Sequence, residues 1–331
     1  MNDFWTDKQV LVTGAGGFIG SHLVESLLSQ GASVRAFVRY TSRQDLGLLR
    51  QLNPGDLAQV EVIAGDLRDE HAVRQAVRGC ELVFHLGALI SIPYSYQHPA
   101  EVASTNFMGT LNVLMACREF DVQRLVHTST SEVYGTARRV PIDEGHALQG
   151  QSPYSASKIG ADKLAESFYC AYNLPVVTVR PFNTYGPRQS ARAVIPTIIT
   201  QALVQDAMQL GNQTTTRDFT YVSDTVDGFL RAAEARDVEG GVFNLGIGQE
   251  ISIGELASRI IQIVDRRVAV TLDSERLRPG RSEVMQLLSD NRLARERLGW
   301  SPAVTLDQGL RSTIAWIREH LHLFRVGRYE M

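Results

Sequence analysis

The chain has 331 residues, which is long enough for one large α/β unit and a smaller second domain. Its formal net charge of -3 gives no electrostatic reason to expect a nucleic-acid partner. The sequence contains no run of about 18 apolar residues, so we expect no transmembrane span and no membrane partner. Residues 1–8 carry two acids, unlike a signal peptide, and we therefore expect a cytoplasmic protein.

The three cysteines are few, odd in number and far apart. Cys80, Cys117 and Cys170 all lie among apolar neighbours. This pattern predicts buried thiols in a reducing compartment, and it argues against a disulfide framework or a metal site.

The first half of the chain alternates short β-branched runs with helical patterns. The predicted strands are 9–13, 33–38, 60–64, 82–85, 124–128 and 176–180, and the predicted helices are 21–30, 70–77, 106–120 and 156–173. Strict alternation implies right-handed crossovers, and so an α/β fold with a doubly wound parallel sheet. Ligands of such sheets bind beyond the carboxyl ends of the strands.

The composition and the pattern of apolar residues change after Pro181. Prolines, arginines and polar stretches interrupt short helical patterns, for example in 182–196 and 276–283. We therefore predict a dinucleotide-binding domain at 1–180 and a smaller, lid-like α/β substrate domain at 181–331. Residues 241–246 have a strand pattern that could rejoin the main sheet.

A glycine-rich turn separates the first predicted strand from the first helix. Gly14, Gly17 and Gly20 would allow a tight turn and let a pyrophosphate approach the amides at the helix N-terminus. A tight strand-to-helix turn needs glycine in any case, but this context favours a dinucleotide site. The spacing differs from the G-x-G-x-x-G of ordinary dehydrogenases.

The end of the second strand bears on the choice of cofactor. NAD sites usually place an acid there for the ribose diol, whereas this chain has Arg39, with Arg43 close behind. Two guanidinium groups could meet a 2′-phosphate, so NADP is slightly favoured over NAD, although both arginines could simply be solvated. Asp66 and Leu67 follow the third strand and are placed to contact the adenine, unless Asp66 only caps a turn.

Tyr154 and Lys158 are four residues apart on a predicted helix and project from the same face. There the ammonium group is expected to lower the pKa of the phenol, so that Tyr154 can exchange protons near neutral pH. A polar triplet with a carboxylate, Thr130, Ser131 and Glu132, follows the fifth predicted strand.

Six motifs in one order give the chain a family resemblance. They are Gly14-x-x-Gly17-x-x-Gly20, Gly65-Asp66-Leu67, His85-Leu86-Gly87-Ala88, Thr130–Gly135, Tyr154-x-x-x-Lys158 and Arg180–Arg188. The set resembles the extended short-chain dehydrogenase/reductase (NAD-dependent epimerase/dehydratase) family over nearly the whole chain. The resemblance implies a Rossmann-type N-terminal domain, a nucleotide-sugar domain, a homodimer built on the Tyr-bearing helices, and an NAD(P)+ cofactor that is held and recycled. It also places Phe18, Ile19, Leu86 and Ala88 among the cofactor contacts.

Members of this family with such motifs are 4-epimerases, 4,6-dehydratases and decarboxylases of nucleotide sugars. In all three reactions the family's Tyr, here Tyr154, takes the proton of the sugar C4 hydroxyl as hydride leaves C4. The resemblance implies that Lys158 holds the phenolate of Tyr154 and the nicotinamide ribose. It also implies that Thr130 donates a hydrogen bond near the sugar C4 hydroxyl.

Glu132 and Ser131 bear on which of these three reactions the chain catalyses. A carboxylate beside C5 can remove the proton that a C4 ketone acidifies, so Glu132 favours water loss over epimerisation unless it only caps a turn. Glucose-type dehydratases resemble Thr-Asp-Glu here, and Ser131 cannot supply the acidic proton of that Asp. The longer motifs most resemble the bacterial UDP-N-acetylglucosamine 4,6-dehydratases. A UDP-glucuronate decarboxylase, a 4-epimerase and a non-catalytic dinucleotide sensor stay open as alternatives.

The resemblance also places the substrate. Asn183 matches the family position that contacts the diphosphate or the sugar, and Arg192, Arg217 and Arg278 lie in stretches that recruit phosphate and uridine contacts. Tyr94 follows the fourth strand and is expected to line the sugar pocket, unless it is a packing residue.

Overall fold

The computed structural model describes residues 4–327, and its centre is a seven-stranded sheet in which all neighbouring strands are parallel. The strands are β1 (Gln9–Thr13), β2 (Ser33–Arg39), β3 (Glu61–Gly65), β4 (Leu82–His85), β5 (Arg124–Thr128), β6 (Val176–Pro181) and β11 (Val242–Leu245). Their order is β11-β6-β5-β4-β1-β2-β3. This order reverses between β1 and β4, and ligands of doubly wound sheets bind beyond the strand ends at such a point. The predicted Rossmann-type α/β fold is confirmed.

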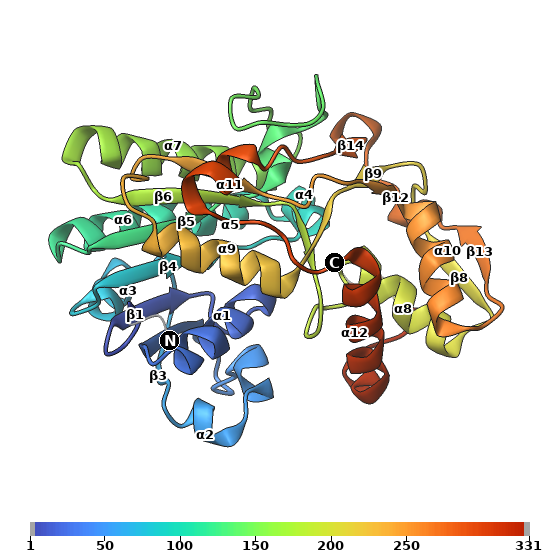
Figure 1. Cartoon of the computed structure of the whole chain (residues 1–331), viewed down its shortest axis with the longest axis horizontal. Coiled ribbons are helices and arrows are strands. Elements are labelled where there is room, and N and C mark those ends of the chain that lie inside the picture. Colours follow the sequence, from blue (N-terminus) through green and yellow to red (C-terminus); the bar gives the residue numbers. More distant parts are fainter. Residues whose placement is uncertain (1–3, 328–331) are drawn as a thin grey trace.

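Helices cover both faces of this sheet (Figure 1). Helices α1 (Phe18–Ser29) and α9 (Val222–Glu234) pack on one face, and α3 (Glu70–Val77), α6 (Gly109–Glu119) and α7 (Pro153–Tyr172) pack on the other. Successive side chains of a strand point to opposite faces. Val10 and Val12 therefore join the core under α1 and α9, whereas Leu11 joins the core under α3, α6 and α7.

Part of the sheet comes from the second half of the chain. Strand β11 pairs with β6 along the edge of the sheet, and α9 packs against β5, β6 and α1. The division of the chain into two domains at residue 180 stays a prediction.

A second core lies beside one end of the large sheet (Figure 1). Helices α8 (Val194–Val204), α10 (Ile253–Val264) and α12 (Leu306–Glu319) bury apolar faces against one another there. A two-stranded parallel sheet of β8 (Ala207–Leu210) and β13 (Ala269–Leu272) flanks them.

The remaining elements are short. They are α2 (Pro54–Leu57), α4 (Ile92–Gln97), α5 (Pro99–Ala103), β7 (Asn183–Tyr185), β9 (Thr216–Arg217), β10 (Phe219–Tyr221), β12 (Ile251–Ser252), β14 (Gln286–Leu287), α11 (Arg292–Leu298) and the 3-10 turns η1 (Gly47–Gln51), η3 (Ser131–Tyr134), η4 (Ser274–Arg276), η5 (Gly280–Ser282) and η6 (Leu321–Leu323). Strand β7 pairs with β10, and β9 pairs with both β12 and β14. Two predicted substrate residues, Asn183 and Arg217, therefore stand on short strands outside the large sheet.

Two sequence-based expectations need correction. The predicted helix 106–120 begins instead as a π-helical turn, η2 (Ser104–Met108), before α6 starts at Gly109. Cys80 and Cys117 are buried as expected, but Cys170 is exposed, because the last turn of α7 runs out into solvent. Within residues 4–327, no helix combines the length and the apolar character needed to cross a membrane.

Candidate active site

The turn between β1 and α1 has no room for side chains. Gly14 has a φ of +71°, and a Cβ there would lie 2.8 Å from the backbone nitrogen of Gly87. A Cβ on Gly20 would lie 2.3 Å from the carbonyl oxygen of Gly14. At Gly17, α1 begins with no capping side chain and no acid in its first turn, so its amides and positive dipole end are available to an anion. This turn fits a dinucleotide pyrophosphate.

The other predicted cofactor contacts surround this turn. Phe18 and Ile19 open α1, and Leu86 and Ala88 follow β4; all four are half-buried. Leu67, just beyond β3, is buried beneath the loop after β4. The carboxyl ends of β1, β3 and β4 thus bring together residues that are far apart in the sequence.

Arg39, at the end of β2, meets a carboxylate. Its guanidinium Nη2 lies 3.4 Å from Oε1 of Glu101 on α5. The hydroxyl of Tyr94, on α4, donates to the other oxygen, Oε2, at 2.5 Å. Arg43 lies exposed in the loop after β2. The structure therefore pairs one of the two predicted 2′-phosphate ligands with an acid, and it directs the hydroxyl of Tyr94 to that acid.

Asp66 lies directly beyond β3 and binds the guanidinium of Arg68, with Nη2 2.6 Å from Oδ2. Hydrogen bonding by Arg68 lowers the pKa of the Asp66 carboxyl. The carboxylate is charged and partly exposed at the place expected for an adenine contact.

Thr130, Ser131 and Glu132 lie directly beyond the carboxyl end of β5. The hydroxyl of Thr130 caps η3 by accepting a hydrogen bond from the backbone nitrogen of Glu132 at 3.2 Å. Ser131 is buried, whereas Glu132 is half-buried. The triplet thus lies at the edge of the sheet where ligands of this fold bind.

Tyr154 is in the first turn of α7, which Ser152 and Ser155 cap reciprocally. Its side chain is buried, with 7% of the residue exposed. Burial raises the pKa of the Tyr154 phenol, a hydrogen bond with Thr130 lowers it, and the charge of Glu132 raises it again. The phenol, the threonine hydroxyl and the carboxylate therefore stand in one site.

Lys158 lies one turn further along α7. Its Nζ donates a hydrogen bond to the carbonyl oxygen of Thr128 at 2.6 Å. Burial lowers the pKa of Lys158 to about 8, although the charge of Asp162 acts to raise it. The expectation that Lys158 lowers the pKa of Tyr154 is wrong for the protein alone, because the ammonium bonds to the strand backbone and burial dominates at the phenol.

Asp162, one further turn along α7, is the centre of a buried polar network. Its Oδ2 accepts hydrogen bonds from Ser129 at 2.7 Å and from Arg180 Nη2 at 2.9 Å, and its Oδ1 lies 3.2 Å from Nε2 of His127. Burial acts to raise the pKa of this carboxyl, but His127, Arg180 and Lys158 together bring it down to about 2. A fixed negative charge therefore lies one turn from Lys158.

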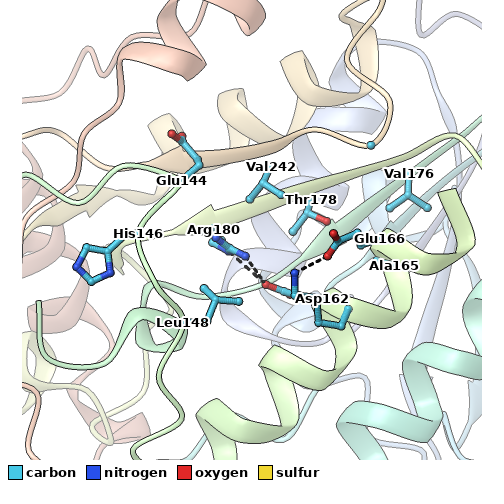
Figure 2. A pocket seen from close by; sticks show the side chains of 12 residues that line it. Glu144, His146, Leu148, Asp162, Ala165, Glu166, Val176, Thr178, Arg180 and Val242 are labelled. Carbon is cyan, nitrogen blue, oxygen red and sulfur yellow. Dashed lines mark hydrogen bonds and ion pairs between the residues drawn. The ribbon is translucent and has the colours of Figure 1, made fainter. Parts of the chain in front are cut away.

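The Asp162–Arg180 pair also lines a cavity of about 260 Å³ (Figure 2). Glu144 and His146 form other polar parts of its wall, and burial raises the pKa of Glu144. The predicted site residues all belong to the described part of the chain, and none of them lines this cavity. The cavity therefore adjoins the candidate active site through Asp162 and Arg180 but contains none of the predicted site residues.

The substrate residues predicted from the sequence differ in their environments. The side-chain oxygen of Asn183, on β7, is buried and has no hydrogen-bond partner among residues 4–327. Arg192 is exposed in the loop before α8, with its Nε 3.3 Å from Oγ of Ser190. Asn183 therefore offers an unused acceptor, whereas Arg192 lies at the surface.

Arg217 and Arg278 converge on Glu283. Arg217 Nη2 lies 3.7 Å and Arg278 Nη1 lies 3.9 Å from the same oxygen, Oε1. Burial lowers the pKa of the Arg217 guanidinium, and the nearby charge of Glu132 raises it. Arg278 Nη1 is buried and makes no hydrogen bond within the described residues. Arg217 thus lies near Glu132 and near Arg278, which keeps a donor available.

The sequence analysis did not identify three acidic residues of this region as site residues. Asp162 extends the four-residue spacing of Tyr154 and Lys158, and this spacing could have identified it. Glu101 and Glu283 have no such local signal, because their partners come from distant segments.

A family model described as GDP-mannose 4,6 dehydratase matches residues 11–313. The chain belongs to this family. Membership confirms the predicted resemblance to the extended short-chain dehydrogenases/reductases, and with it the general class of nucleotide-sugar enzymes.

Relatives of this family member are named for three different reactions. A UDP-glucose 4-epimerase of Mycolicibacterium smegmatis is 33% identical, over 94% of the chain and 98% of the relative. A UDP-N-acetyl-alpha-D-glucosaminuronate decarboxylase of Bacillus cytotoxicus is 31% identical, over 94% and 98%. The crystal structure of the dTDP-glucose 4,6-dehydratase DesIV from Streptomyces venezuelae, with NAD bound, has a TM-score of 0.84 and 28% identity, over 96% of the chain and 99% of DesIV.

Proposed function

We propose that this family member is a 4,6-dehydratase of UDP-N-acetylglucosamine, yielding a UDP-4-keto-6-deoxy sugar. The observation that carries the proposal is the carboxylate of Glu132, which is close enough to Tyr154 for its charge to raise the pKa of the phenol. A 4-epimerase needs only the proton exchange at Tyr154, whereas a dehydratase also needs a base for C5.

The chemistry follows from these groups. Tyr154 takes the proton of the C4 hydroxyl while Thr130 holds the phenol, and Lys158 orients the ribose of the cofactor. A nicotinamide cofactor, when bound, accepts hydride from C4 and returns it to C6. Glu132 removes the C5 proton that the C4 ketone acidifies and gives it to the departing C6 hydroxyl, which leaves as water. The proton that Tyr154 took from the C4 hydroxyl balances the proton that C5 regains when hydride is returned to C6. The net change is the loss of one water molecule from the sugar.

The binding groups support the same proposal. The glycine turn before α1 would hold the pyrophosphate of NAD(P)+, and Arg217 and Arg278 would hold the diphosphate of the UDP-sugar. DesIV, the similar structure, contains NAD. We further propose a cytoplasmic homodimer built on α6 and α7, whose outer faces expose Met115 and Tyr172.

A UDP-glucuronate decarboxylase is the second candidate. Ser131 favours it, because a hydroxyl cannot protonate the departing C6 oxygen as a carboxylic acid would. A decarboxylase needs no such acid, since C6 leaves as carbon dioxide after C4 is oxidised. The relative from Bacillus cytotoxicus is named for a decarboxylation of this kind.

One experiment separates these candidates. The purified protein is incubated with UDP-N-acetylglucosamine or UDP-glucuronate, without added cofactor, and the products are weighed by mass spectrometry. Loss of one water from the first sugar is the expected result and shows that bound cofactor is recycled. Loss of carbon dioxide from the second identifies the decarboxylase, and an isomer of unchanged mass that chromatography separates from the substrate identifies a 4-epimerase. Binding of cofactor with no turnover of either sugar, even after NAD(P)+ is added, favours a dinucleotide sensor.

A further inference from the structure

Glu101 lies at the end of β2 although it belongs to α5. One of its carboxylate oxygens accepts a hydrogen bond from the hydroxyl of Tyr94 at 2.5 Å, and the other faces Arg39 Nη2 at 3.4 Å. The ring of Tyr94 also packs on His98, with ring centroids 4.4 Å apart. The phenol therefore fixes one carboxylate oxygen and leaves the other directed at Arg39.

The end of β2 is where dinucleotide sites distinguish their cofactors. An acid there accepts hydrogen bonds from the 2′-hydroxyl of NAD, and a nearby Arg accommodates the 2′-phosphate of NADP. In this chain β2 itself supplies only Arg39, which alone would favour NADP. Glu101 adds, from a different helix, the carboxylate that the strand lacks.

The charges around this strand end are already balanced. Arg39 pairs with Glu101, and Arg68 pairs with Asp66 beyond the neighbouring strand β3. A 2′-phosphate would bring about two negative charges next to the Glu101 carboxylate and would have to displace it from Arg39. A 2′-hydroxyl carries no charge and can donate to the same carboxylate.

We propose that Glu101 makes the cofactor site selective for NAD over NADP by occupying Arg39 and by repelling a 2′-phosphate. This inference rests on the proposed function, since it requires a dinucleotide at the glycine turn. It reverses the slight preference for NADP that Arg39 and Arg43 gave in the sequence.

The test measures which cofactor the protein retains. The purified protein is equilibrated with equal concentrations of NAD+ and NADP+, washed and denatured, and the released cofactors are counted by mass spectrometry. The unaltered protein should release mainly NAD+. Glu101→Gln keeps an acceptor for Tyr94 but removes the charge, so we expect the NADP+ to NAD+ ratio to rise roughly fivefold, as for the loss of one exposed charge interaction.

Two controls make the result specific. Glu119→Gln breaks another exposed ion pair, with Arg74 on α3, and should leave the ratio unchanged. The double variant Glu101→Gln/Arg39→Ala should lose the gain, because the freed guanidinium is what receives the phosphate. An unchanged ratio in Glu101→Gln, or a preference for NADP+ in the unaltered protein, overturns the inference and leaves the proposed function standing. If the protein retains neither cofactor, the proposed function fails as well.

Discussion

The helix that carries Tyr154 and the segments that carry the substrate arginines are built in different ways. On α7, Tyr154, Lys158 and Asp162 are all buried and follow one another by single turns. Arg217 and Arg278 stand on a two-residue strand and in a loop, and both pair with Glu283 only at 3.7 Å or more. A long helix therefore holds the groups proposed to react, and short irregular segments hold the groups proposed to bind the substrate.

This difference in local structure indicates how each region is arranged to interact with a ligand. Groups that move protons must be held in place before the substrate arrives, because misplacement costs rate directly. Groups that bind a diphosphate can keep unused donors and acceptors, such as Arg278 Nη1 and the side-chain oxygen of Asn183. We expect substitutions on α7 to change kcat, and substitutions among the arginines to change KM.

Tyr154→Phe should have the largest effect. Loss of the phenol removes the group that takes the C4 proton, and turnover of UDP-N-acetylglucosamine should fall by about a thousandfold or more. Product formation by mass spectrometry measures this. Tyr169→Phe, on an exposed residue of the same helix, serves as the control and should keep full turnover. Near-normal activity of Tyr154→Phe would remove Tyr154 from the chemistry.

Glu132→Gln should separate oxidation from water loss. The amide cannot take the C5 proton, so dehydration should slow by roughly a hundredfold or more while oxidation at C4 persists. Reduced nicotinamide should then accumulate, which its absorbance reports. Unchanged turnover would refute the role of Glu132 as a base and would weaken the dehydratase proposal.

Asp162→Asn should change the pH dependence of turnover. Burial lowers the pKa of Lys158 to about 8, so its charged form is present below that pH and is lost as the pH rises through it. The negative charge of Asp162 opposes this lowering, while His127 on β5 and Arg180 on β6 share its carboxylate. Without that charge, the alkaline loss of kcat should move down by roughly one pH unit.

A pH–rate profile of kcat tests this shift. Asp143→Asn removes an exposed carboxylate that pairs with Arg139 and should leave the profile in place. A variant of Asp162 that loses activity equally at every pH would show a purely structural role.

The arginines should show the smallest effects, and mainly on KM. Arg217→Lys keeps the charge but loses the forked donors, so KM for the UDP-sugar should rise roughly tenfold with kcat little changed. Arg192→Lys, at an exposed residue bonded only to Ser190 among the described contacts, should change KM less than twofold. Equal effects at the two positions would contradict the contrast drawn between buried and surface arginines.

Much of the large sheet could be predicted from the sequence, because local patterns decide it. The β-branched runs at β1, β4 and β5 match the structure residue for residue, since strands buried on both faces are continuously apolar. The π-helical turn before α6 and the exposed end of α7 were missed, because packing against other segments decides them and local composition does not.

The candidate site was predictable where its residues are close in sequence. Tyr154 and Lys158 lie one turn apart on α7, as their spacing indicated, and Thr130 meets Tyr154, as the family resemblance implied. The direction of the pKa change at Tyr154 was not predictable, because it depends on how deeply α7 buries the phenol. Glu101 and Glu283 act on residues from distant segments, and a single sequence does not show such contacts.

Helix α9 and strand β11 come from the second half of the sequence, and this order affects how the chain folds while it is synthesised. Strand β6 leaves the ribosome before β11, which pairs with its outer edge, has been translated, and α9, which covers β5 and β6, is also translated after β6. Until then, one apolar face and one strand edge stay open to chaperones and to other nascent chains. The cofactor-binding half thus reaches its final form only when most of the polypeptide has been synthesised, and we expect a chain that stops at residue 180 to aggregate.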